Sequence, residues 1–113
     1  MNKICTDIDQ SKKLIELGID VNTADMLWTY DFMVNDINGV NVISEQLKPE
    51  ENDIPAWSLT ALLGLMPTFR LNGFGNGQFN CRDERANNYA LVDTCPLDAV
   101  FEMVCWLKEK KLL

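Results

Sequence analysis

The sequence predicts a single α+β domain in which three helices pack against one antiparallel sheet of four or five short strands. Three observations support this prediction. The 113 residues are 47% hydrophobic and 24% charged, which is typical of one globular domain. Three segments combine helix-capping residues with an apolar repeat. The segments between them alternate in polarity and carry turn signals, so the expected order is α-β-β-α-β-β-β-α.

The first two expected helices are defined by residues that favour helix ends. The first begins after Thr6 or Asp7 and stops at Gly18, because glycine readily adopts the left-handed conformation that follows a helix. The second lies within residues 55–66, where proline suits the first helical position and Ser58 is an alternative N-cap.

The third helix follows Cys95 or Thr94, with Pro96 at its first position. At about 100° per residue, Leu97 and Trp106 fall on opposite sides of this helix, and both sides are apolar. We therefore expect the helix either to be sandwiched in the core or to turn its outer side toward another chain.

The strands are predicted from alternation and turn signals. Residues 26–33 alternate with aromatic enrichment, Asn38-Gly39 carries a hairpin signal, and residues 40–43 form the returning strand. Residues 44–53 read as a charged loop. Three further strands form a meander around residues 69–72, 78–82 and 89–92.

Three stretches, residues 10–26, 53–67 and 95–107, resemble a family of small uncharacterised proteins from gut anaerobic bacteria, often associated with phages and mobile elements. The resemblance covers about 45 of the 113 residues and rests mainly on caps and core positions. It implies a setting in a phage or mobile element, and it carries no catalytic residue over to this chain.

The charge balance excludes several classes of partner. Seventeen acidic and ten basic residues give a net charge of −7, which argues against direct binding to nucleic acid or to an anionic membrane. No apolar run approaches the roughly 20 residues that a membrane helix needs. The absence of histidine removes the commonest general base and the commonest metal ligand.

The four cysteines, Cys5, Cys81, Cys95 and Cys105, contain no C-x-x-C motif, so a zinc or redox site is not expected. Residues 1–7 lack the apolar segment of a signal peptide, and we expect a cytoplasmic protein with reduced, buried cysteines. Cys95 is the best candidate nucleophile because it precedes a helix, but a capping or core role is the expected one.

The remaining candidate motifs favour ordinary structural roles. The glycine-rich segment 73–77 lacks the Lys-Ser/Thr of a phosphate loop, and Asp36 with Asn38 lacks the spacing of a calcium loop. The acid pairs Glu50-Glu51 and Asp83-Glu84 read as solvated loop residues. Five aromatic residues are expected in the sheet core rather than on a stacking platform: Trp28, Tyr30, Phe69, Phe79 and Tyr89.

The sequence therefore predicts no catalytic residue, metal or cofactor. The favoured hypothesis is a non-enzymatic protein-interaction module, with a homodimer as one form of it and Trp57, Met103 and Trp106 as candidate interface residues. Two alternatives stay open. One is an acidic decoy that inhibits a nucleic-acid-handling or defence protein, and the other is an enzyme with a loop-built site.

Overall fold

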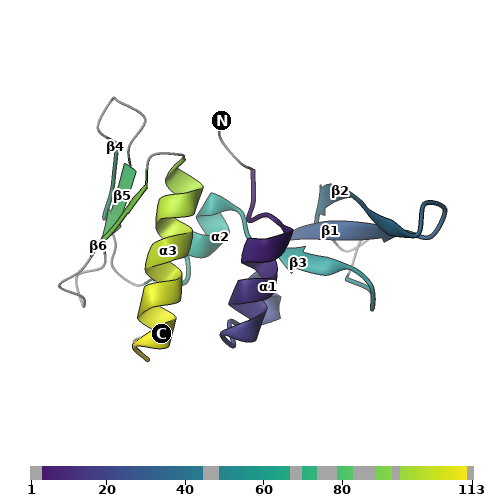
Figure 1. Ribbon diagram of the computed structural model, residues 1–113, viewed down its shortest axis with the longest axis horizontal. Coiled ribbons are helices and arrows are strands. Elements are labelled where there is room, and N and C mark those ends of the chain that lie inside the picture. Colours follow the sequence, from purple (N-terminus) through teal and green to yellow (C-terminus); the bar gives the residue numbers. More distant parts are fainter. Residues whose placement is uncertain are drawn as a thin grey trace.

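The computed structural model describes residues 4–44, 49–66, 70–73, 79–82, 89–92 and 95–111. Its elements follow the order α1, η1, β1, β2, β3, α2, β4, β5, β6, α3, so the α+β class is as predicted. Figure 1 shows the helices between two sheets, which lie at opposite ends of an elongated molecule. The principal extents are 46 × 31 × 22 Å.

The helices begin and end where local chemistry favours it. Helix α1 (Ile8–Glu16) starts with a capping box. The Asp7 carboxylate accepts the Gln10 backbone N–H, and the Gln10 side-chain oxygen accepts the Asp7 backbone N–H. The helix is followed by the C-cap Leu17 and by Gly18, whose φ of +91° confirms the predicted left-handed residue. The helices α2 and α3 span Leu59–Leu63 and Pro96–Glu109, and a short 3-10 turn, η1, spans Val21–Thr23.

The strands form two separate antiparallel sheets rather than the single sheet predicted. Sheet A has the order β2-β1-β3, and sheet B has the order β4-β5-β6. The bounds are β1 Met26–Asp31, β2 Asp36–Val42, β3 Ile54–Ala56, β4 Arg70–Gly73, β5 Phe79–Arg82 and β6 Tyr89–Val92.

The two-sided apolar pattern of α3 explains why a second sheet is needed. Leu97, Ala99, Met103 and Cys105 are all buried, although they lie around much of the helix circumference. Helix α3 lies against β5 and β6 on one side and against α2 on the other (Figure 1). A helix that is apolar on both sides requires a covering layer on each side, and one sheet with helices on one face cannot supply both.

Helix α2 lies within the predicted residues 55–66, but it does not begin at Pro55, which was one of the two predicted starts. Residues 54–56 form β3 and pair with β1, with Pro55 opposite Leu27. The alternative cap is the correct one: the Ser58 hydroxyl accepts from the Ala61 backbone N–H at 3.2 Å, and α2 begins at Leu59.

The first hairpin turns earlier than its Asn-Gly signal predicted. Strand β1 ends at Asp31, residues 32–35 form the turn, and Asp31 lies opposite Asp36. Gly39 instead lies within β2 at φ +89°, where two residues of β2 face the single residue Thr29 of β1 in a β-bulge. The predicted loop 44–53 and the glycine-rich segment 73–77 fall partly outside the described residues, and the pair Asp83-Glu84 lies outside them entirely.

The core has a large and a small part. The large cluster joins the buried faces of α1, α2 and α3 around Trp57 and Leu14. The small cluster, Cys5, Met26 and Ala56, lies between the segment before α1 and sheet A. Sheet A is therefore held at its inner end, and the β1–β2 hairpin extends away from the helices (Figure 1).

Candidate functional site

The end of the β1–β2 hairpin carries the most exposed apolar group among the described residues. Phe32, Met33 and Val34 are 70%, 93% and 58% exposed and follow one another in the chain. We call these three residues the apolar tip. Single exposed apolar residues are ordinary on protein surfaces, but contiguous ones mark contact sites. Because the tip ends a projecting hairpin, it can enter a concave surface on another molecule.

The turn that holds the apolar tip is defined by polar groups on either side of it. The Asp31 carboxylate accepts the Met33 backbone N–H at 2.8 Å and the Asn38 side-chain amide at 3.1 Å. These bonds hold the pKa of Asp31 below its usual value, with the Asn38 contribution the largest. Asn35 adopts φ +58°, a conformation that asparagine tolerates, and accepts from the Tyr30 hydroxyl. The tip is therefore presented on an ordered turn.

A small cleft lies beside the tip. Tyr30 and Phe32 meet edge to face, with ring centroids 4.9 Å apart. The opposite wall is residues 50–53, and the cleft volume is about 170 Å³. Asp53 anchors this wall, because its carboxylate accepts the backbone N–H of Tyr30 at 2.8 Å and of Glu50 at 2.9 Å. The cleft is smaller than the roughly 300–1,000 Å³ of small-molecule sites, so it suits a single side chain.

Among the described residues, the charged groups around the tip are all acidic. The sequence has no lysine or arginine from residue 14 to 47 or from residue 49 to 69. Asp31 and Asp36 face each other at the base of the turn, and like charges opposite one another destabilise a strand pair. The five described acids of this acidic collar are Asp31, Asp36, Glu50, Glu51 and Asp53.

The structure places the three predicted interface residues away from this tip. Trp57 is 0% exposed, and its indole N–H donates to the Thr23 hydroxyl at 2.9 Å. Met103 is 1% exposed within α3, and Trp106 is half-buried against the large cluster. The structure therefore uses these side chains in the core and does not gather them on a surface.

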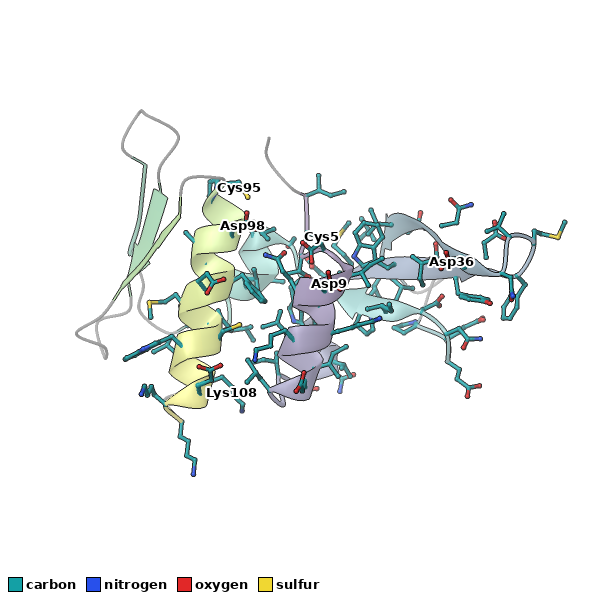
Figure 2. The ribbon with its side chains drawn as sticks, in the orientation of Figure 1. Cys5, Asp9, Asp36, Cys95, Asp98 and Lys108 are labelled. Atoms are coloured by element: carbon teal, nitrogen blue, oxygen red, sulfur yellow. The ribbon has the colours of Figure 1, made fainter. Side chains whose placement is uncertain are left out.

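The described cysteines are buried and free. Burial is the largest cause that raises the pKa of Cys5 to about 11 and that of Cys105 to about 12. Cys95 is the N-cap residue of α3, makes no capping hydrogen bond with its side chain and is 1% exposed, which fits the expected core role. Figure 2 shows Cys5 and Cys95 on separate parts of the chain. The Cys81 side chain lies outside the described residues.

Among the described residues, the other candidate motifs do not form a further binding or catalytic site. Asp36 and Asn38 lie on β2, where Asp36 accepts the Ile37 backbone N–H and Asn38 donates to Asp31. Within the described ranges, no three His, Cys, Asp or Glu side chains come together as metal ligands would. Trp28 donates to the Thr6 carbonyl at 3.0 Å. The side chains of Phe69, Phe79 and Tyr89, residues 74–77 of the glycine-rich segment and the pair Asp83-Glu84 lie outside the described residues.

Sequence reasoning missed the apolar tip because Phe32 continues the period-two pattern of β1. The signal that marks it is the break in that pattern: three apolar residues in succession, bracketed by the turn formers Asp31 and Asn35.

Comparison with known proteins adds no relative to this picture. No family model, no curated protein and no solved structure matches the chain. In the part of the chain that the structure describes, no helix has both the length and the apolar character needed to cross a bilayer.

Proposed function

We propose that this chain is a non-enzymatic protein-interaction module that binds a basic partner protein through the apolar tip of its β1–β2 hairpin. The observation that carries the proposal is the exposure of Phe32, Met33 and Val34 at the end of a projecting, ordered hairpin. Burying this surface in a pocket of a partner would contribute roughly 25 cal/mol of binding free energy for each Å² of apolar area removed from water.

The acidic collar supports a basic partner. Asp31, Asp36 and the acids of residues 50–53 lie around the apolar tip, and the described residues between 14 and 66 include no lysine or arginine. Lysine or arginine side chains around the partner's apolar pocket would relieve the repulsion between these carboxylates. The cleft beside Tyr30 and Phe32 is the position where one such cation would meet both aromatic faces and carboxylates.

An acidic decoy is the weaker alternative, because the acids at this end surround an apolar patch instead of following one another like phosphates. A cytoplasmic setting and a phage or mobile-element origin, as the family resemblance implies, belong to the same proposal. The free, buried cysteines support a reducing compartment.

The proposal is tested by site-specific photo-crosslinking. Benzoylphenylalanine replaces Met33 in the full chain, and in a control chain it replaces Val21, which is 44% exposed on η1. After irradiation in host cells, we expect a discrete cross-linked protein from position 33 and none from position 21. The same cross-link should weaken several-fold when Glu50→Gln and Glu51→Gln are combined. Equal products from both positions, or none from either, would refute the proposal.

A further inference from the structure

Strand β2 forms an edge of sheet A whose charge, Asp36, and bulge, at Gly39, both lie toward the apolar tip, which leaves residues 40–42 open. It has β1 on one side and no strand on the other among the described residues, and Figure 1 shows it along the outer margin of the sheet. Proteins normally protect such edges with charges, proline or very short strands. The opposite edge follows this rule, because β3 has three residues and contains Pro55. Residues 37–44 contain neither charge nor proline.

The backbone groups on this edge can be assigned from the pairing with β1. The Ile43 N–H donates to the Asp25 carbonyl at 3.0 Å, and residues along β2 alternate between facing β1 and facing outward. Asn41 therefore shares the orientation of Ile43, whereas the N–H and C=O groups of Val40 and Val42 point away from the sheet. The Val42 side chain is 64% exposed. The bulge at Gly39 interrupts the strand only on the side nearer the tip.

We propose that two copies of this chain associate by antiparallel pairing of β2 with β2, about a two-fold axis at Asn41. In this register, Val40 of each copy lies opposite Val42 of the other, and both residues have their outward backbone groups available for hydrogen bonding. The valines form cross-strand pairs of the kind that stabilise sheets. The two copies of sheet A then become one continuous sheet.

Charge favours a second copy as the occupant of this edge. Because residues 37–44 are uncharged, two edges approach without like-charge repulsion despite the net charge of −7 on each chain. The antiparallel arrangement also directs the two hairpins in opposite directions, which keeps the Asp31 and Asp36 carboxylates of the copies apart. The inference is independent of the proposed function, since the apolar tip stays open in the dimer.

Sedimentation equilibrium of the full chain tests the pairing. We expect the mass to rise with concentration from 12.9 kDa toward twice that value. Val42→Lys places like charges across the axis, and Val42→Pro removes the outward N–H, so both variants should remain monomeric. Val21→Lys, a control at another exposed valine, should associate like the parent chain.

Circular dichroism confirms that each variant is folded. The proposal is overturned if the parent chain stays at 12.9 kDa throughout the soluble range, or if both Val42 variants still dimerise. It is also overturned if Met33→Ser, and not Val42→Lys, abolishes association, because the tip would then be the contact between copies. Cross-linking to another protein from position 33 is a separate readout, so the two proposals can fail independently.

Discussion

Thr6 links helix α1 to sheet A, and its substitution tests how the hairpin is anchored. The Thr6 side chain is fully buried, accepts the Trp57 backbone N–H at 3.1 Å and shares a 2.7 Å hydrogen bond with the Ser11 hydroxyl. Its backbone N–H donates to the Trp57 carbonyl, and its carbonyl accepts the Trp28 indole N–H. Thr6→Val keeps the shape and the backbone bonds of this residue but removes the hydroxyl.

The expected loss follows from the groups left without that hydroxyl. A buried polar group deprived of its partner costs about 1–3 kcal/mol. The Trp57 N–H loses the oxygen to which it donates, whereas the Ser11 hydroxyl keeps a 3.5 Å contact with the Thr6 carbonyl. We therefore expect Thr6→Val to lower the free energy of unfolding by about 1–3 kcal/mol, a large part of the roughly 5–15 kcal/mol of a typical domain.

Urea unfolding monitored by tryptophan fluorescence measures this loss. Thr29→Val is the control, because its half-buried hydroxyl contacts the Asn38 carbonyl at 3.2 Å near the surface, and we expect a change within about 0.5 kcal/mol. Ser11→Ala completes a double-mutant cycle, in which the double variant should lose less than the two single variants added together. A loss below about 1 kcal/mol for Thr6→Val, or full additivity in the cycle, would refute this account of how Thr6 links α1 to sheet A.

Three further predictions concern the hairpin and the thiols. Replacing Met33 and Val34 of the apolar tip by serine should change the free energy of unfolding by less than about 0.5 kcal/mol, as urea denaturation would show, because both are exposed in the folded chain. Gly39→Ala should cost about 1–2 kcal/mol in the same assay, since φ is +89° there although no atom lies within 4 Å of an added Cβ. The thiols of Cys5 and Cys105 have a raised pKa in the folded state, so the stability they contribute is complete below pH 9.0 and is lost as the pH rises through about 11 to 12. Denaturation midpoints measured between these pH values should fall in the parent chain and fall less in a Cys5→Ala, Cys105→Ala variant.

Features fixed by neighbouring residues could be predicted from the sequence. The helix start after Asp7 and the left-handed Gly18 depend on contacts within one helical turn, and the structure confirms both. The two-sided apolar pattern of α3 likewise predicted that the helix would be covered on both sides or would meet another chain. The structure shows cover on both sides, with sheet B as the second layer.

Features decided by competition between segments could not be predicted in this way. Asn38-Gly39 is a sequence typical of hairpin turns, but the chain turns between Asp31 and Asp36 instead. The positive φ of Gly39 serves a β-bulge within β2. Residues 54–56 lie shortly before α2, yet they form a strand. Their pairing with β1 gives partners to backbone groups on the side of β1 that faces away from β2. Trp57 follows this strand into the core, so its burial depends on a pairing that no local pattern reveals.

Lysines and acidic residues are distributed unevenly over the molecule, and this distribution affects how a charged partner would approach it. The described lysines lie on α1 or at the end of α3, whereas the charges of sheet A are acidic; Figure 2 shows Lys108 and Asp36 far apart in the molecule. A basic partner is therefore attracted more strongly to the hairpin than to the helices, where lysines offset the acidic residues. At physiological ionic strength, screening over about 8 Å limits this steering, so added salt should slow association. Dissociation depends mainly on the apolar contact at Met33 and its neighbours and should respond much less to salt. In the proposed interaction, the acidic collar would thus orient the encounter with the partner, and the apolar tip would prolong the complex.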